Sequence, residues 1–293
     1  MTAISRVLVA GAGAMGSQIA MVTALAGYEV VLYDLDPQMT ERGVQSLRAR
    51  MQSQVTKGRR SATDVAAAFA RLSTSTTLSG DVDLVIEAIV EKLEVKREFF
   101  GTIAALTGPS TILASNSSSF VPSSMAAAVD HPERFVNLHF FNPALVMKCV
   151  EVVRGPQTAD DTAKAAIGFV ESLGKLPVVL DKEIPGFIAN RLLNAVRDEA
   201  ISLYEGGYAD VEAIDTAART ALGYPMGPFE LMDLTGIDIG YHTKMARFAD
   251  TGDPADKPSD TVTALVSAGH LGRKTGRGFY RYDSTGERLG KAD

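Results

Sequence analysis

Short apolar runs alternate with longer amphipathic segments through the N-terminal part of the chain. Strand-like runs, rich in β-branched and aromatic residues, occupy positions 7–10, 30–33, 84–89, 111–115, 135–140, 149–153 and 177–180. Helix-like segments separate most of these runs, which is the pattern of a mainly parallel sheet covered by helices on both faces. The pattern therefore predicts an α/β fold.

Two regions depart from this alternation. Residues 39–71 are rich in helix formers and are broken near Gly58, which predicts a helical pair inserted after the second strand. Beyond Ile184-Pro185-Gly186 the strand-like runs stop, and the spacing of apolar residues predicts helices over 187–204, 211–222, 228–248 and 260–268. We expect two domains, the first over residues 1–183 and an all-α second domain over residues 184–293.

The composition narrows the class of protein. The 293 residues are 46% hydrophobic and 22% charged, with a net charge of -6 and a single cysteine, Cys149. Such an acidic chain lacks the broad excess of Lys and Arg that nucleic-acid binding requires, and no apolar run reaches the length of a transmembrane helix. We therefore expect a cytoplasmic globular protein, with a lone cysteine typical of a reducing compartment, and no nucleic-acid, membrane or metal partner.

A glycine-rich loop follows the first strand-like run and precedes a helix-like segment. It reads Gly11-Ala12-Gly13-Ala14-Met15-Gly16, a G-x-G-x-x-G pattern in the context that binds dinucleotides. The first glycine permits the tight turn, the second the approach of a pyrophosphate, and the third close packing of helix on strand. Asp34 ends the second strand, where a carboxylate binds the adenine ribose 2′-hydroxyl and repels the extra phosphate of NADP. These residues predict a Rossmann-type domain that binds NAD.

A histidine and a glutamate fall in two strand-like runs that follow one another. The alternation of apolar and polar residues from Phe135 to His139 predicts a half-buried strand that ends at the histidine, and Asn142-Pro143 turns the chain. Glu151 lies in the next run, so two adjacent strands bring its carboxylate to the imidazole. This is the layout of a general base with an orienting acid. The alternative is a solvated surface histidine and an unrelated edge-strand glutamate.

Four further motifs occur in order along the chain. They are Ala-Ser-Asn-Ser-Ser-Ser at 114–119, Leu-His-Phe-Phe-Asn-Pro at 138–143, Ile-Pro-Gly-Phe-Ile-Ala-Asn-Arg at 184–191, and the glycine-rich tail at 272–280. With the glycine loop, they cover nearly the whole chain, which resembles the L-3-hydroxyacyl-CoA dehydrogenase family. In size and layout it is most similar to the monofunctional 3-hydroxybutyryl-CoA dehydrogenases.

The resemblance implies an NAD domain followed by a helical domain that forms a homodimer, with an acyl-CoA substrate in the cleft between the domains. It implies the NAD-dependent, reversible oxidation of a 3-hydroxyacyl-CoA at C3. His139 corresponds to the catalytic base, Glu151 to its partner, and Ser118 and Asn190 to groups that hydrogen-bond the substrate oxygen. The other residues implied at the site are Glu91, Lys96 and Asn116 on the nicotinamide side and Asn142 on the substrate side.

The inserted helical pair carries a local excess of positive charge. Between Glu41 and Thr63 the only acid is Glu41, and the basic residues are Arg42, Arg48, Arg50, Lys57, Arg59 and Arg60. Such a patch suits the phosphates of coenzyme A. Lys57 and Arg59, which flank the break at Gly58, are the candidate contacts, and an ordinary solvated helix pair is the alternative.

Two rival functions remain open at this level. Ser119-Phe120-Val121-Pro122-Ser123 is similar to the related L-gulonate dehydrogenases and lens-type crystallins, so a sugar-acid dehydrogenase is the first rival. The run from Leu138 to Pro143 matches the acyl-CoA enzymes better. The second rival is a non-catalytic NAD-binding structural protein, which has no physical need for Ser118, His139, Glu151 and Asn190 together. The acyl chain length is not predicted, because residues 144–147 lack the second proline that many relatives carry beside the acyl pocket.

Overall fold

The computed structural model describes residues 4–292, which form two compact units. The first unit ends at Ile188 and the second begins at Ala189, whereas the sequence placed the boundary between residues 183 and 184. The difference arises at Phe187, which is fully buried in a cluster with Val153 and Leu180 of the first unit. The end of the Ile-Pro-Gly-Phe motif is therefore part of the first unit.

The first unit is built on an eight-stranded sheet with the order β3-β2-β1-β4-β5-β6-β7-β8. All neighbouring strands are parallel except β6 and β7, which confirms the expected mainly parallel sheet. The strands are β1 (Arg6–Ala10), β2 (Glu29–Tyr33), β3 (Leu72–Ser75), β4 (Leu84–Glu87), β5 (Ile112–Ser115), β6 (Phe135–Phe140), β7 (Cys149–Arg154) and β8 (Leu176–Leu180). The sequence did not predict β3, because this edge strand reads Leu-Ser-Thr-Ser and has only one apolar residue.

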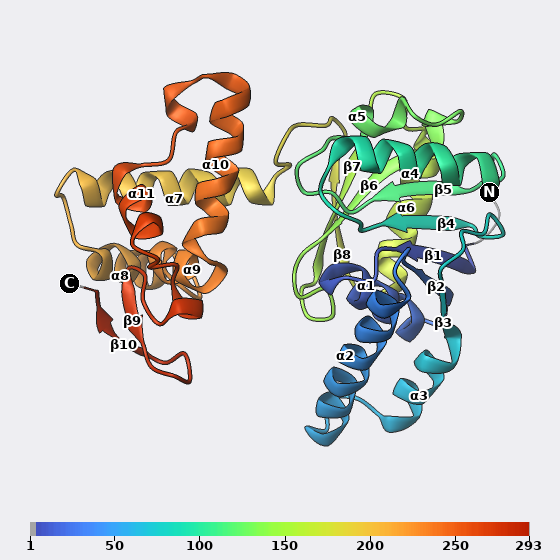
Figure 1. Cartoon of the computed structure of the whole chain (residues 1–293), viewed down its shortest axis with the longest axis horizontal. Coiled ribbons are helices and arrows are strands. Elements are labelled where there is room, and N and C mark those ends of the chain that lie inside the picture. Colours follow the sequence, from blue (N-terminus) through green and yellow to red (C-terminus); the bar gives the residue numbers. More distant parts are fainter. Residues whose placement is uncertain (1–3, 293) are drawn as a thin grey trace. The chain divides into compact units, whose positions relative to one another are not determined.

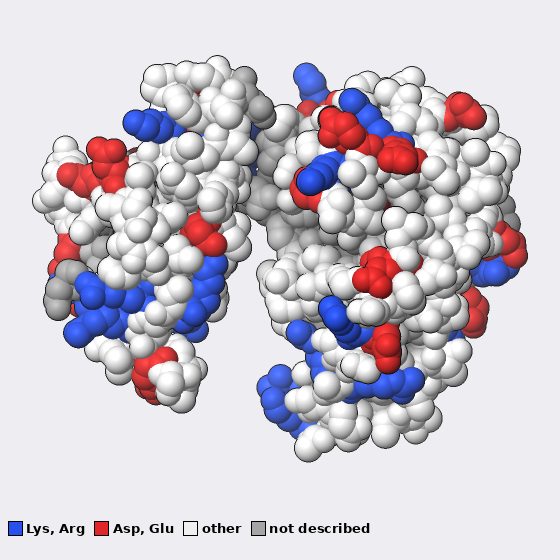
Figure 2. Space-filling view, in the orientation of Figure 1, with Lys and Arg blue, Asp and Glu red and all other residues white. Residues whose placement is uncertain are grey.

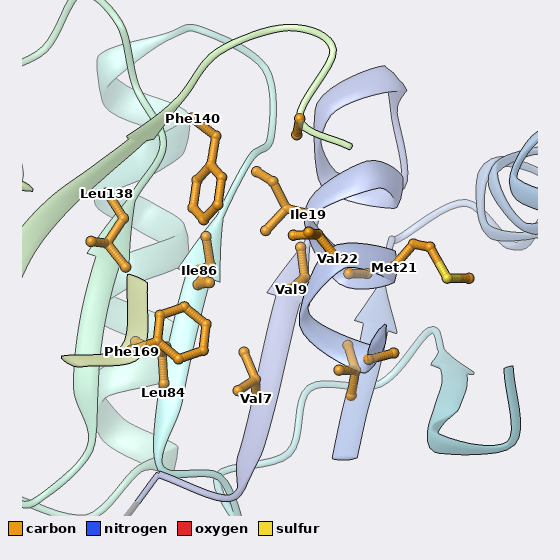
Figure 3. Packing of buried hydrophobic residues seen from close by; sticks show 14 of the residues in the cluster. Val7, Val9, Ile19, Met21, Val22, Leu84, Ile86, Leu138, Phe140 and Phe169 are labelled. Atoms are coloured by element: carbon orange, nitrogen blue, oxygen red, sulfur yellow. The ribbon is translucent and has the colours of Figure 1, made fainter. Parts of the chain in front are cut away.

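Helices cover both faces of this sheet (Figure 1). They are α1 (Ala14–Leu25), α2 (Pro37–Thr56), α3 (Ala62–Arg71), α4 (Leu93–Leu106), α5 (Pro122–Ala126) and α6 (Asp160–Ser172). Alternate residues of β1 point to opposite faces: Val7 and Val9 pack in a cluster with α1 and α6, and Leu8 packs with α4 and α5. Figure 3 shows part of the first cluster. The predicted helical pair is confirmed as α2 and α3, with Gly58 at a φ of 65° between them.

Burial on both faces corrects one expectation about β6. All of its residues are buried, although the alternation from Phe135 to His139 predicted a half-buried strand. Asn137 is fully buried, and its side-chain amide donates a hydrogen bond to the Phe120 carbonyl at 2.9 Å. The alternation thus reflects two polar side chains, Asn137 and His139, with internal partners rather than a face open to water.

The second unit is helical, with a short hairpin near its end. It contains α7 (Ala189–Glu205), α8 (Val211–Ala221), α9 (Pro228–Thr235), α10 (Ile237–Thr251), α11 (Asp260–Ser267), and the antiparallel strands β9 (Tyr280–Tyr282) and β10 (Arg288–Lys291). The expectation of a domain made only of helices missed this hairpin. The predicted helix over 228–248 is divided at Gly236, whose φ of 100° ends α9 and starts α10. Within residues 4–292, each helix is too short or too polar to cross a lipid bilayer.

Candidate active site

Parallel strands bring their carboxyl ends to one edge of the sheet, and the candidate residues gather there. The loop after β1, the ends of β4 and β5 and the end of β6 surround a cavity of about 330 Å³ in the first unit. Its lining includes Met15, Glu91, Lys96, Asn116, Ser118, His139, Phe141 and Asn142. Residues from three separate motifs of the sequence, together with Glu91 and Lys96, therefore share one pocket.

The three glycines of the loop have different structural requirements. Gly11 has a φ of 97°, and a Cβ there would lie 2.4 Å from the Ala88 carbonyl oxygen. A Cβ on Gly16 would lie 1.8 Å from the carbonyl oxygen of Gly11. Gly13, the N-cap of α1, has an ordinary φ of -67°, and a Cβ there would meet nothing within 4 Å. Gly13 therefore leaves open space at the N-terminus of α1, where a pyrophosphate fits.

Asp34 lies directly beside this loop. One carboxylate oxygen accepts a hydrogen bond from the Ala12 backbone N–H at 2.8 Å, and the other accepts one from the Asp36 N–H at 3.1 Å. Because β1 and β2 are neighbours in register, the end of β2 places this carboxylate next to the glycine turn. The arrangement fits the adenosine half of a dinucleotide.

His139 and Glu151 form a buried pair across two strands. They are direct partners in the antiparallel register of β6 and β7, and His139 Nδ1 lies 2.7 Å from Glu151 Oε2. The residues are 5% and 1% exposed, which rules out the alternative of a solvated surface histidine. The second carboxylate oxygen of Glu151 accepts a hydrogen bond from the Ile188 N–H at 2.9 Å. A carboxylate at Nδ1 favours the tautomer that leaves a lone pair on Nε2.

Two aromatic rings fix the orientation of the imidazole further. The ring centroids of Phe141 and Phe187 lie 4.5 and 5.5 Å from that of His139. Phe187 is fully buried. Its role at the site is not predicted from the sequence, because Phe187 stands nearly fifty residues along the chain from the histidine and only the fold brings the two rings together.

Glu91 organises the serine loop that follows β5. Its Oε1 accepts hydrogen bonds from Ser117 Oγ at 2.5 Å, from the Ser118 N–H at 3.2 Å and from the Ser119 N–H at 3.1 Å. Burial acts to raise the pKa of Glu91, but the Lys96 ammonium and the hydrogen bonds from the loop outweigh it and hold that pKa below its ordinary value. Glu91 is therefore a carboxylate that holds the backbone of Ser118 in place.

Glu87 is a further residue of this site that the sequence motifs did not predict. Glu87 at the end of β4 is fully buried; its Oε1 lies 2.5 Å from Lys96 Nζ and its Oε2 accepts from Ser115 Oγ at 2.6 Å. Lys96 is 1% exposed and also pairs with Glu91 at 3.0 Å. Burial raises the pKa of Glu87, and the Lys96 ammonium opposes this effect. The signal in the sequence was a charged residue inside the apolar run 84–89.

Asn116 connects the ends of β5 and β6. Its side-chain oxygen accepts a hydrogen bond from the Phe140 N–H at 2.8 Å, and its backbone N–H donates to the Glu87 backbone carbonyl at 2.8 Å. Because the side-chain oxygen is engaged in this way, the side-chain amide nitrogen is the group of Asn116 that can bind other partners. Asn142 lines the same pocket and is exposed.

The remaining predicted residues lie outside this pocket. Lys57 is the C-cap residue after α2, Arg59 follows it in the turn, and both side chains are exposed. Figure 2 shows Lys and Arg side chains gathered over α2 and α3. Asn190 is the second residue of α7 and is described with the second unit, whereas the pocket is lined by residues of the first unit alone.

The fold and the pocket together define a class of enzyme. A parallel sheet with a glycine loop after β1, a carboxylate at the end of β2 and a histidine–carboxylate pair at the strand ends is the arrangement of a nicotinamide-dependent dehydrogenase. Two family models match the chain: "3-hydroxyacyl-CoA dehydrogenase, NAD binding domain" over residues 6–184 and "3-hydroxyacyl-CoA dehydrogenase, C-terminal domain" over residues 186–282. The chain belongs to the 3-hydroxyacyl-CoA dehydrogenase family, which confirms the resemblance.

Individual relatives agree over most of the chain. It is 40% identical over 282 residues to a probable 3-hydroxybutyryl-CoA dehydrogenase of Bacillus subtilis, which covers 96% of this chain and 98% of that protein. It is 41% identical over 293 residues to the mitochondrial hydroxyacyl-coenzyme A dehydrogenase of Homo sapiens, with 95% and 91% covered. The solved structure of (S)-3-hydroxybutyryl-CoA dehydrogenase from Ralstonia eutropha is similar with a TM-score of 0.89 and 35% identity, covering 96% of this chain and 100% of that one.

Proposed function

We propose that the protein catalyses the reversible oxidation of (S)-3-hydroxyacyl-CoA to 3-oxoacyl-CoA with NAD, and that 3-hydroxybutyryl-CoA is a substrate. The observation that carries the proposal is the buried His139–Glu151 pair, which lines one pocket with Ser118 and Asn116. The family membership and the names of the relatives in Bacillus subtilis and Ralstonia eutropha support the substrate class.

The glycine loop and Asp34 hold the cofactor in this proposal. The N–H groups at the start of α1, over Gly13, Ala14 and Met15, face the pyrophosphate, and Gly11 and Gly16 let the loop and the helix approach each other. The Asp34 carboxylate binds the ribose 2′-hydroxyl and selects NAD over NADP. NAD, when bound, supplies the acceptor for the hydride that leaves C3.

His139 Nε2 is the proposed acceptor of the hydroxyl proton. As the hydride leaves C3, the O–H bond breaks, its proton passes to Nε2, and its electron pair forms the carbonyl. Glu151, held by the Ile188 N–H, stabilises the resulting imidazolium. Ser118 and Asn190 are proposed to hydrogen-bond the reacting oxygen and so position C3.

The residues on the nicotinamide side of the pocket have two different proposed roles. Glu91 and Lys96 line the pocket, yet most of their hydrogen bonds go to the serine loop and to Glu87. We therefore propose that they act on the cofactor mainly by fixing the pocket wall, while the side-chain amides of Asn116 and Asn142 are the groups that contact ligands directly.

The proposal also covers the contacts with coenzyme A, the oligomeric state and the cellular location of the protein. Lys57 and Arg59 on the inserted pair are proposed to meet the phosphates of coenzyme A, supported by the local excess of basic residues. A homodimer through the second unit is supported by exposed apolar side chains there, among them Leu192, Leu234 and Ile239. A cytoplasmic location is supported by the single cysteine in the sequence.

One assay separates this proposal from its rivals. Protein, NADH and acetoacetyl-CoA are mixed, and the loss of the reduced-nicotinamide absorbance is followed. We expect turnover by the wild-type protein. In His139→Gln, turnover should be absent and NADH binding should be retained. Turnover of L-gulonate with NAD but not of the thioester would replace the proposal by the sugar-acid dehydrogenase, and NADH binding without turnover of either would favour a non-catalytic protein.

A further inference from the structure

The second unit contains a cavity that the proposed reaction does not use. Its volume is about 570 Å³, and all of its lining belongs to the second unit. The wall is formed by α7 with Asn194, Arg197 and Ile201, by α10 with Gly240 and Tyr241, and by α11. The wall is mixed, with apolar side chains beside three cations, Arg197, Lys244 and Lys257, and two carboxylates, Asp198 and Glu205.

Arg197 brings a charge into this cavity, and none of the carboxylates among the described side chains pairs with it. Its Nη2 donates a hydrogen bond to Thr235 Oγ1 at 2.9 Å, and its Nε is buried with no hydrogen-bond partner in the described part of the chain. The neighbouring acid, Asp198, forms its ion pair with Lys244 at 2.8 Å instead. Burial lowers the pKa of Arg197, with Asp198 acting in the opposite direction. Charges that are removed from water in proteins are normally paired, so a half-buried guanidinium left in this way suits an anion.

The position of Arg197 along α7 relates it to the substrate. Asn190, the proposed contact of the reacting oxygen, stands seven residues earlier in the same helix, and Asn194 lies between them. At 3.6 residues per turn the three share one face, and Arg197 is displaced by about 10 Å along the axis. The Cα–Cβ bonds of a helix tilt toward its N-terminus, which is the Asn190 end of α7. An acyl tail that starts at Asn190 and follows this face reaches Arg197.

We propose that the cavity on α7 binds the far end of the acyl chain and that Arg197 selects a chain that ends in a carboxylate. The preferred substrates are then 3-hydroxyacyl-CoA thioesters of dicarboxylic acids. This inference rests on the proposed function and narrows its substrate class. Arg197 is a specificity residue here, remote from the reacting atoms.

The physical basis is whether the guanidinium is paired, which differs between the complex with a carboxylate-ended chain and the complex with a methyl-ended chain. A terminal carboxylate accepts two parallel N–H bonds from Arg197 and balances its charge. A terminal methyl group removes water from the cavity and leaves the charge desolvated and unpaired, which is costly. Polar sites of this kind discriminate strongly against an analogue that cannot fill them.

The test compares pairs of substrates of equal length. The wild-type protein is assayed with NADH and 3-oxoacyl-CoA thioesters of six and eight carbons, each ending either in a carboxylate or in a methyl group. We expect a higher kcat/KM for the carboxylate-ended member of at least one pair. In Arg197→Met the ratio of the two kcat/KM values should fall by about 30-fold or more, through loss with the carboxylate and gain with the methyl group. Arg197→Lys, which keeps the charge but not the fork, should lower the ratio by about tenfold.

A matched control separates this effect from a general loss of charge. Arg247→Met removes a guanidinium from α10 that is already paired with Asp256 at 2.7 Å and does not line the cavity, so the ratio should stay near the wild-type value. Circular dichroism establishes whether each variant is folded. If Arg197→Met does not fold, the ratio measured for Arg197→Lys is the test of the inference.

Two results would overturn the inference. The first is a wild-type preference for methyl-ended chains that Arg197→Met and Arg197→Lys leave unchanged. The second is an equal loss with both substrates accompanied by a lower sedimentation mass, which would assign Arg197 to an acid of a second copy of the chain. Failure of the proposed function itself looks different, because none of the thioesters would be reduced by the wild-type protein.

Discussion

Lys96 Nζ lies 2.5 Å from Glu87 Oε1, and the two side chains are 1% and 0% exposed. The same ammonium lies 3.0 Å from Glu91 Oε2, so one buried cation holds two carboxylates. Glu87 also accepts from Ser115 Oγ, and Glu91 accepts from the backbone of Ser118. The loop that carries the proposed substrate contact is thereby tied to the core of the sheet.

Replacing Glu87 by Gln tests this connection. The substitution keeps the shape and leaves Lys96 buried with Glu91 as its remaining carboxylate partner, so we expect the free energy of unfolding to fall by about 2 kcal/mol, less than for a charge left entirely alone. Urea denaturation measures it. Glu94→Gln, at an exposed position in α4, is the control and should change stability by less than about 0.5 kcal/mol. Equal stability of the two variants would contradict the view that Glu87 holds the lysine.

The glycine loop offers a test that separates folding from binding. In Gly16→Ala the new Cβ would lie 1.8 Å from the Gly11 carbonyl oxygen, so we expect a loss of about 2 kcal/mol or more in stability. In Gly13→Ala the Cβ meets nothing within 4 Å, and the loss of stability should stay below about 1 kcal/mol, the cost of alanine at an N-cap. The dissociation constant for NADH should nevertheless rise about tenfold or more in Gly13→Ala, because the methyl group occupies the space next to the pyrophosphate.

Thermal unfolding and NADH fluorescence titration provide the two measurements. Gly174→Ala, a glycine outside the loop at a φ of 69°, serves as the control for a stability loss without a change in NADH affinity. A Gly13→Ala variant that binds NADH as the wild type does would show that the cofactor does not approach the loop there.

The sequence predicted the sheet better than it predicted the site behind the pocket. Apolar runs with intervening helices identify buried parallel strands, because such strands are apolar on both faces, as β4 and β6 are. An edge strand such as β3 carries no such signal, and a break such as Gly236 inside a continuous apolar period depends on a local φ. His139 and Glu151 were predicted as a pair because two consecutive strands put them near each other.

Glu87 and Phe187 were missed for a different reason. Each takes its role from contacts that are distant in sequence: Glu87 from Lys96 and Ser115, and Phe187 from the ring of His139. A pattern along the chain shows that a glutamate interrupts an apolar run, but the identity of its partners depends on the packing of α4 and β5 against β4. Arg197 is a similar case, since its lack of a paired carboxylate among the described residues is visible only in three dimensions.

The second unit should show a stability that depends on pH through Asp233. This residue is 1% exposed and accepts hydrogen bonds from the backbone of Phe279 and Tyr280 and from the Tyr282 hydroxyl. Burial, assisted by Asp215, raises the pKa of Asp233 despite these bonds. The folded protein then holds this proton more tightly than the unfolded chain does. The resulting stability is fully present below the unfolded pKa of about 3.9 and is lost as the pH rises through the folded pKa.

The difference in unfolding free energy between the wild type and Asp233→Asn isolates this contribution. We expect the difference to be larger at pH 5 than at pH 8, because a proton that the fold holds more tightly is bound more fully at the lower pH. Asp260→Asn, at an exposed position of the same unit, controls for the loss of a carboxylate. A difference that stays constant or grows with pH would show that Asp233 is not held in its protonated form by the fold.

The role proposed for Glu151 leads to the sharpest activity test. Its Oε2 meets His139 Nδ1 at 2.7 Å and its Oε1 accepts from the Ile188 N–H at 2.9 Å. A glutamine has only one oxygen, so in Glu151→Gln either the imidazole or the Ile188 N–H faces an amide NH₂. The tautomer with a lone pair on Nε2 and the imidazolium both lose their support, and kcat with acetoacetyl-CoA should fall about 10²- to 10³-fold.

The kcat of the double variant, compared with the kcat values of the two single variants, distinguishes a role of Glu151 in catalysis from a role in packing. Because Glu151 acts through the imidazole, the double variant of His139→Gln and Glu151→Gln should be no slower than His139→Gln alone. NADH affinity should change by less than about twofold in each variant, since neither side chain belongs to the glycine loop. Additive losses in kcat, or a parallel loss of NADH binding, would mean that Glu151 supports the pocket as a whole rather than the base. Glu171→Gln, on the exposed surface of α6, provides the matched control and should retain wild-type kcat.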